Sequence, residues 1–255
     1  MGMSLQDTGH DFGTVVTLHG ADRPLDFVLV CEHASARIPD SLDQLGLSSK
    51  ARLSHAAWDI GAADIAVSLA TRLNAPLVMG DVSRLVYDCN RPLDAPDCIP
   101  AQSEVFAVPG NASLNADQRQ TRHQLVHEPF HAAISQLLDG AGLDTVLVTI
   151  HSFTPVYNGQ RRNVDIGYLC DQDDRMALAA LRAEAKAAKH RAALNAPYSA
   201  SDGVTHTLQL HGEARGLANV MVEVRNDLID TPETAKAMAK HLEGILRAAR
   251  AEVLG

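Results

Sequence analysis

Residues able to bind a metal ion follow apolar segments at three places in the chain: Glu32-His33, His151-Ser152 and Glu223. In an open α/β sheet, ligands gather outside the carboxyl ends of the strands. Two histidines and a carboxylate at such a place can hold a zinc ion with one position left open for water. A further Glu can then take a proton from that water as a general base. The pattern therefore favours metal-assisted hydrolysis.

A second metal-binding pattern competes with the first. Residues 127–131, His-Glu-Pro-Phe-His, match the H-E-x-x-H motif of helical zinc proteases. That motif needs an unbroken helix, whereas Pro129 lacks a backbone donor and clashes with the preceding turn. His123 continues the same four-residue spacing. We therefore expect a polar helix stripe here rather than a protease zinc site.

Arginines are concentrated in the same parts of the sequence, after apolar segments: Arg84, Arg91, Arg161, Arg162 and Arg225. The chain has a net charge of −9, so grouped arginines stand out as binders of a small anionic ligand. A guanidinium matches a carboxylate with two parallel hydrogen bonds. The alternative is that some of them only neutralise neighbouring carboxylates.

Composition excludes several classes of protein. The 255 residues are 46% hydrophobic and 21% charged, as in a globular protein, and the acidic balance argues against a nucleic-acid partner. No apolar segment reaches the ~18–20 residues of a membrane span, and we expect no secretory signal. Four cysteines without C-x-x-C spacing favour a reduced, cytoplasmic setting. Glycine-rich nucleotide loops and a G-x-S-x-G elbow are missing from the sequence.

The elements that must position these residues alternate along the chain. Continuous apolar runs predict buried strands at 26–31, 75–79, 145–150 and 218–224. Helical patterns occupy 60–73, 114–138, 175–193 and 232–250, with Asp59, Asn115 and Thr231 in capping positions. This order predicts an α/β fold, a three-layer α/β/α sandwich around a mostly parallel sheet, in one domain spanning 1–255.

The proline-rich segment 90–111 interrupts this pattern, and we expect no regular element in it. Irregular loops longer than ~12–15 residues are usually functional or disordered. It is interpreted as a cover over the active site, with a plain surface loop as the alternative.

The chain resembles the N-formylglutamate amidohydrolase family, in a branch of predicted members. The resemblance rests on segments in family order: Val30-Cys-Glu-His-Ala-Ser35 with Ile38-Pro39, Asp59-Ile-Gly61, Ser83-Arg84 through Asn90-Arg91, Arg122 with residues 127–131, His151-Ser-Phe153, and Glu223-Val-Arg-Asn-Asp227. It implies a phosphorylase/hydrolase-like fold distantly related to zinc carboxypeptidases. It also implies zinc-assisted cleavage of an amide C–N bond, as in releasing formate from N-formyl-L-glutamate.

The metal ligands predicted from this resemblance include one departure. Zinc carboxypeptidases carry a Glu three residues after the first His, but Ala36 stands there. The carboxylate ligand must be Asp59 or Glu32, and we favour Asp59, because neighbouring residues on a strand point to opposite faces and Glu32 adjoins His33. Helix capping is the alternative role for Asp59. We thus expect one Zn²⁺ per chain, held by His33, Asp59 and His151.

The remaining roles follow the same resemblance. Glu223 is expected to be the general base, and the substrate is expected to contact Arg84, Asn90, Arg91, Ser152 and Arg225, with Arg161 and Arg162 as secondary candidates. The predicted substrate is a small anionic acyl-amino acid. Two alternatives remain open: a carboxypeptidase-like or other N-acyl amino acid hydrolase, and a non-catalytic anion-binding protein. The sequence does not determine the oligomeric state.

Overall fold

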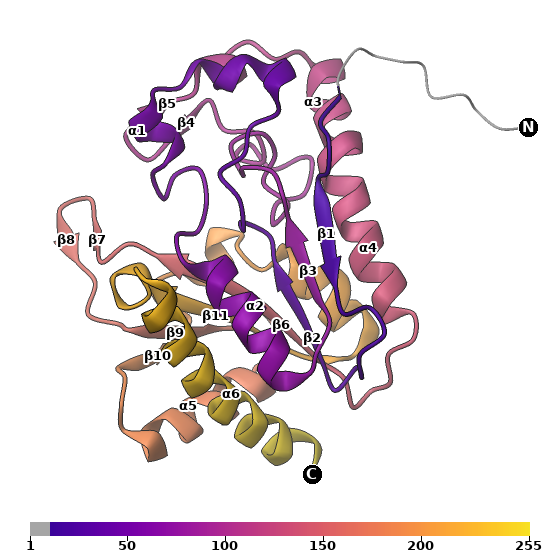
Figure 1. Cartoon of the computed structure of the whole chain (residues 1–255), viewed down its shortest axis with the longest axis vertical. Coiled ribbons are helices and arrows are strands. Elements are labelled where there is room, and N and C mark those ends of the chain that lie inside the picture. The colour runs from indigo at the N-terminus through magenta and orange to yellow at the C-terminus, as the bar shows by residue number, and fades with distance from the viewer. Residues whose placement is uncertain (1–10) are drawn as a thin grey trace, which may run out of the picture.

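A seven-stranded sheet in the order β1-β3-β2-β6-β11-β9-β10 forms the centre of the computed structural model, which describes residues 11–255 (Figure 1). Its strands are β1 Val16–His19, β2 Phe27–Cys31, β3 Leu77–Gly80, β6 Val146–Phe153, β9 Ile166–Leu169, β10 Ala192–Leu194 and β11 Ala218–Arg225. Strands β3, β2, β6 and β11 run parallel, while β1 and β9 pair antiparallel with their neighbours β3 and β11. The sheet is mostly parallel, as predicted.

Helices cover both faces of this sheet. The α-helices are α1 Ser49–Arg52, α2 Ala62–Leu73, α3 Ala116–Arg122, α4 Glu128–Leu138, α5 Arg175–Ala187 and α6 Pro232–Leu254. Short 3₁₀ turns are η1 Asp40–Gly46, η2 Pro109–Asn111, η4 Ala200–Asp202, η6 Glu213–Arg215 and η7 Asn226–Leu228. Helices α2, α5 and α6 pack together on one face, and α4 lies on the other (Figure 1). The predicted three-layer sandwich is confirmed.

The central strands are buried on both sides because their apolar residues alternate between two cores. Leu29, Val148 and Val220 face the core beneath α2, α5 and α6, whereas Val30 and Leu147 face the core beneath α4. Every residue of β2, β6 and β11 is buried. This double burial explains why the sequence shows continuous rather than alternating hydrophobicity.

Several element boundaries differ from the sequence prediction. Strand β6 continues through Phe153, so His151 and Ser152 lie within the strand rather than after it. The helix expected over 175–193 ends at Ala187, because Ala188 adopts a left-handed conformation and the chain then forms β10. The last helix extends beyond 250 to Leu254.

Segment 90–111 is less irregular than expected, since it contains the two-stranded hairpin of β4 Gln102–Ser103 and β5 Phe106–Ala107. A second hairpin, which the sequence analysis did not predict, joins β7 Val156–Tyr157 to β8 Gln160–Arg161. Both hairpins contribute to the pocket described below.

The helix expected over 114–138 begins with the predicted Asn115 cap but is not a uniform α-helix. Between α3 and α4, the π-helical turn η3 spans His123–His127, and Pro129 follows in the first turn of α4. The π-helical turn directly before Pro129 changes the backbone hydrogen-bond pattern there, and this accommodates a residue that has no N–H. Pro129 therefore does not break the helix, contrary to the sequence prediction.

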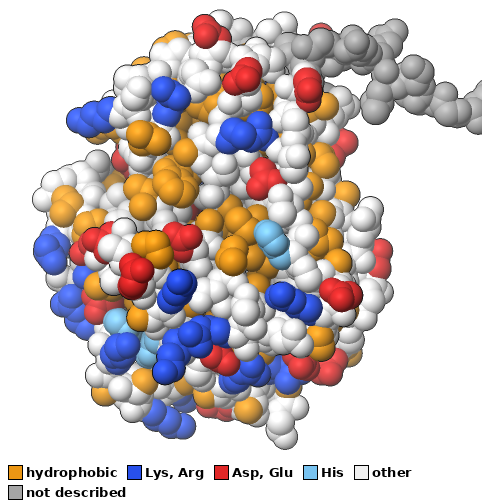
Figure 2. Space-filling model, viewed as in Figure 1, with side chains coloured by type: hydrophobic (Ala, Val, Ile, Leu, Met, Phe, Trp, Pro, Cys, Tyr) orange, Lys and Arg blue, Asp and Glu red, His pale blue; other side chains and the backbone are white. Residues whose placement is uncertain are grey.

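The face of the molecule toward the viewer carries mixed charges. Figure 2 shows acidic side chains among the basic ones over the lower part, where α5 and α6 lie in Figure 1. Within residues 11–255, we find no helix with the length and apolar character that crossing a membrane requires.

Candidate active site

The register between β6 and β11 brings two predicted site residues together. His151 is the Cα partner of Glu223 in this parallel pair. Since Ile150 and Val222 face the core beneath α2 and α6, alternation along each strand turns both His151 and Glu223 to the opposite face. The carboxyl ends of two neighbouring strands thus present an imidazole and a carboxylate side by side.

A compact buried group forms where His33 and Asp59 meet His151. The Nδ1 atom of His151 lies 2.8 Å from Asp59 Oδ2, and the Nδ1 atom of His33 lies 3.3 Å from the same oxygen. The ligand atoms of the three residues all lie within 4.8 Å of one another. All three side chains are buried. The structure therefore places Asp59, rather than Glu32, between the two histidines.

The outer nitrogens of the two imidazoles face carboxylates as well. His33 Nε2 lies 2.7 Å from Asp88 Oδ1, and His151 Nε2 lies 3.0 Å from Glu32 Oε2. The latter contact is an ion pair without hydrogen-bond geometry, so among residues 11–255 neither Glu32 oxygen has a hydrogen-bond partner. Histidines that bind metals commonly donate their second N–H to a carboxylate or carbonyl. The sequence analysis did not identify Asp88 as a site residue.

Charge determines the protonation of this group. Burial would favour neutral forms, but Arg84 and His33 outweigh it and hold the pKa of Asp59 well below its ordinary value. Burial likewise opposes a charged His151, yet the carboxylates of Glu32 and Asp59 hold the pKa of His151 well above its ordinary value. The neighbouring carboxylates raise the pKa of His33 as well, so they favour the protonated form of both imidazoles. A divalent cation could replace these protons.

Contacts with His33 and Arg84 position Asp59, which does not cap helix α2. Its backbone N–H donates to the His33 carbonyl over 2.9 Å, and its carboxylate accepts from Arg84. Helix α2 begins after Gly61, which has φ of +81° and a carbonyl oxygen of Ile229 only 2.6 Å from where a Cβ would stand. Only glycine fits there. The alternative role of Asp59 as a helix cap is wrong.

Glu223 is the carboxylate with the strongest indication of reactivity. It is buried, and no group in the described part of the chain forms a hydrogen bond with its Oε2 atom. Burial raises the pKa of Glu223 to about 7, and the negative charge of Asp59 adds to this effect. A carboxyl group with that pKa can both accept and release a proton near neutral pH.

A pocket of about 700 Å³ opens over this group. His33, Asp59, His151, Ser152 and Glu223 line it. Its walls include residues 97–104 of the proline-rich segment and residues 157–162 around the β7–β8 hairpin. Its volume suits a small ligand, because typical ligand pockets range over ~300–1,000 Å³. Segment 90–111 thus forms one wall of the site.

The arginines predicted to bind substrate differ in how they are used. Arg84 lines the pocket and donates to Asp59 and to the His55 carbonyl. Arg91 lines the pocket but is paired with Asp97 and with carbonyls of the facing segment, and the Asn90 amide is also used within the protein. These contacts give Arg91 and Asn90 a role in holding the pocket wall.

Arg225 lies elsewhere, because Asp165 and Asp227 occupy its guanidinium at 2.7 Å each. Among the described residues that line the pocket, Arg225 is not included. We correct the sequence interpretation for this residue: its environment is that of a buried structural cation, and it does not pair with Glu223.

Arg161 and Arg162, the secondary candidates, face the pocket instead. The guanidinium of Arg162 contacts two aromatic rings, 4.6 Å from the centre of Tyr157 and 4.9 Å from that of Tyr198. Arg161 is exposed on β8, and within residues 11–255 no ion pair or side-chain hydrogen bond holds its guanidinium. The sequence alone did not show which arginines pair with carboxylates of the chain and which remain able to bind a ligand.

Comparison with known proteins settles the relationship. The family model for N-formylglutamate amidohydrolase matches residues 25–230. The chain belongs to the N-formylglutamate amidohydrolase family. This confirms the resemblance found in the sequence, and every residue of the pocket group lies inside the matched range.

Solved structures share the fold of this N-formylglutamate amidohydrolase family member. A gene product of Agrobacterium tumefaciens is 43% identical, with a TM-score of 0.92 over 95% of this chain and 97% of that one. An N-formylglutamate amidohydrolase from Ralstonia eutropha JMP134 is 18% identical, with a TM-score of 0.68 over 93% of this chain and 98% of that one, and supports the fold. A search of curated proteins found no match.

Proposed function

We propose that this member of the N-formylglutamate amidohydrolase family is a metal-dependent hydrolase of small N-acylated amino acids, with N-formyl-L-glutamate as its first candidate substrate. The family supports a hydrolase of this type. The observation that carries the metal requirement is the convergence of His33 Nδ1 and His151 Nδ1 on one oxygen of Asp59, beneath an open pocket.

The donor set fits a zinc ion. Two imidazole nitrogens and one carboxylate leave a coordination position open, as in catalytic zinc sites. The second nitrogen of each imidazole faces a carboxylate, Asp88 or Glu32, which fixes the ring orientation. A zinc ion held by His33, Asp59 and His151 would polarise the amide carbonyl and acidify the attacking water.

The residues of the chain supply the remaining steps. Glu223 accepts a proton from the attacking water while the new C–O bond forms at the amide carbon. The C–N bond then breaks, and Glu223 returns the proton to the leaving nitrogen, so that a carboxylic acid and a free amino acid result. Arg161 pairs with the substrate carboxylate and holds the amide toward Glu223.

Substrate class can be tested with a panel of N-formyl, N-acetyl and peptide substrates offered to the zinc-loaded protein. We expect release of the acyl group from N-formyl amino acids with acidic side chains to be fastest. Preference for a larger acyl group, or for a C-terminal residue of a peptide, would instead support the N-acyl or carboxypeptidase-like alternatives. Metal-loaded protein that hydrolyses none of them would contradict the proposal.

Arg161→Gln should raise KM for N-formyl-glutamate and leave kcat nearly unchanged. A hydrogen bond to a charged group contributes about 1.5–3 kcal/mol, so on the order of tenfold or more in KM is expected. An uncharged amide analogue of the substrate should show a much smaller change. Arg182→Gln, on the exposed side of α5, is the matched control. Equal losses on the charged and uncharged substrates would argue against carboxylate binding by Arg161.

A further inference from the structure

A second group of histidines lies outside the proposed active site. His123 and His127 belong to the π-helical turn η3, His131 belongs to α4, and His206 and His211 come from the segment around the second π-helical turn, η5 Leu208–Gly212. Their rings contact one another, with His127 and His131 centroids 4.1 Å apart. Ring nitrogens of His127, His131 and His206 all lie within 4.8 Å of one another.

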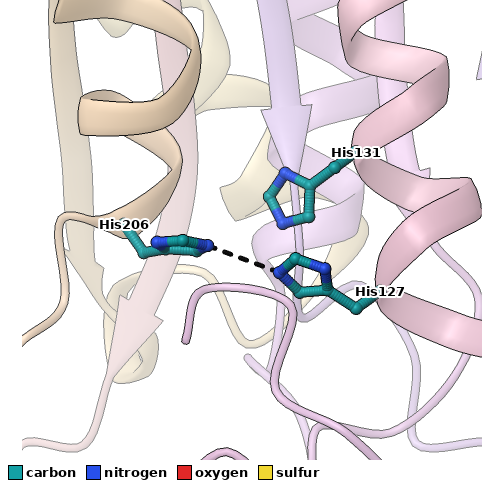
Figure 3. Close-up of side chains that lie close together, drawn as sticks. All are labelled: His127, His131 and His206. Carbon is teal, nitrogen blue, oxygen red and sulfur yellow. Dashed lines mark hydrogen bonds between the residues drawn. The ribbon is translucent and has the colours of Figure 1, made fainter. Parts of the chain in front are cut away.

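The spacing of these nitrogens matches that of metal ligands. The Nε2 atoms of His127 and His206 lie 3.3 Å apart and face each other (Figure 3). Two nitrogens bound to zinc at ~2.0–2.1 Å in a tetrahedral arrangement are separated by about 3.3–3.4 Å. Figure 3 also shows one nitrogen of His131 directed toward the space between the other two rings.

Burial favours the neutral form of all three rings, and a neutral imidazole has a nitrogen lone pair that can bind a cation. Burial lowers the pKa of His127 to about 2 and that of His131 to about 4, and the neighbouring histidines add to the effect in His127. Burial also lowers the pKa of His206. A metal ion that binds these neutral imidazoles would therefore not have to displace the additional proton that an imidazolium carries.

The hydrogen bonds around His131 show what binding would require. Its Nε2 donates to the Cys89 carbonyl over 2.8 Å, and its Nδ1 lies 2.8 Å from Nε2 of His211. A backbone carbonyl in such a position orients a ligating histidine. His131 must give up one of these two hydrogen bonds to bind an ion, whereas His127 and His206 give up only the contact between them.

The backbone supports a specific role for this cluster. Within residues 11–255, both π-helical turns carry or adjoin its histidines, and such turns are frequent at functional sites. The interpretation of residues 127–131 as a zinc-protease motif is still rejected, because the Glu128 side chain is 56% exposed and faces His123. The cluster therefore lacks the general base of that motif.

We propose that His127, His131 and His206 form a second metal site, separate from the His33–Asp59–His151 group, which binds a divalent first-row transition metal such as Zn²⁺ or Co²⁺. Three imidazoles suit such ions. The ion links the helix formed by α3, η3 and α4 to the segment that carries Val204, a residue of the pocket wall. Its role is to hold that wall in place.

The test counts metal ions in protein stripped with a chelator and reloaded with Co²⁺. We expect about two ions per chain in the wild type and about one in His206→Ala. His206 is only partly buried, so this change is the mildest of the three. His123→Ala is the matched control, because its ring stacks on His127 at 4.4 Å but lies outside the trio. It should keep the wild-type number.

A His33→Ala/His151→Ala variant separates this site from the proposed catalytic one. It should lose hydrolysis yet keep about one ion, and should show the visible absorption of Co²⁺ bound by imidazoles. A folded double variant with no ion overturns the second site, as does a His206→Ala protein with the wild-type metal content. If the double variant does not fold, the comparison of wild type with His206→Ala decides alone.

Discussion

Replacing Glu223 with Gln should lower kcat by about 10²–10⁴-fold, the usual contribution of general acid–base catalysis. The change keeps the shape of the side chain and removes the oxygen that accepts a proton. KM and metal content should stay close to those of the wild type, since Glu223 is not among the proposed metal ligands. The measurement is kcat, KM and metal content on one preparation, with Glu233→Gln on the exposed start of α6 as control.

The pH dependence of the wild type checks the same assignment. Glu223 must be ionised to act as a base, so kcat should rise as the pH increases through the pKa of Glu223. That pKa is about 7 in the metal-free chain, and a bound cation would lower it. Glu223→Gln should lack this limb. Because the pKa is raised in the folded chain, the metal-free wild type should lose stability relative to Glu223→Gln as the pH rises from about 4.5 through 7. Near-normal kcat in the variant would end the assignment.

Asp59→Asn should abolish metal binding at the proposed catalytic site, and activity with it. The variant loses the charge that lies between His33 and His151 while it keeps the size of the side chain. Glu32→Gln should be milder: it weakens the orientation of His151 and lowers metal affinity by about 10–100-fold, the usual effect of an outer partner.

Titration with a competing chelator measures both affinities, and a His206→Ala background removes the second proposed site from the count. His33→Ala and His151→Ala should behave like Asp59→Asn. If Asp59→Asn retained its metal while Glu32→Gln lost it, the two carboxylates would exchange roles. Circular dichroism on each variant shows whether the fold survives.

Much of the fold could be predicted because long, continuous apolar runs have few alternatives. The runs at 26–31, 145–150 and 218–224 became β2, β6 and β11. Glu32 directly follows β2, whereas His151 and Glu223 lie within the last three residues of β6 and β11. Strands β1, β9 and β10 have only three or four residues each, so their patterns could not be distinguished from loops.

The missed features depend on contacts between distant segments. No local pattern shows that Asp88 faces His33, or that Asp165 pairs with Arg225 while Arg161 has no ion-pair partner among residues 11–255. The π-helical turn before Pro129 also escaped prediction, because the sequence rule for proline assumes α-helical hydrogen bonding. His206 follows no apolar run, so no pattern in the sequence groups it with residues 127 and 131.

Asp59 receives contacts from His33, Arg84 and His151, on segments that come together only when distant strands pair, as Phe27 does with Val146. An unfolded chain therefore has no such site, and an ion bound there stabilises the native state by mass action. Contacts between residues so far apart in sequence form late and slow folding. If a metal ion binds at this site as proposed, its supply would determine the fraction of transiently unfolded molecules that proteases can cleave. The same supply would also determine the rate of hydrolysis.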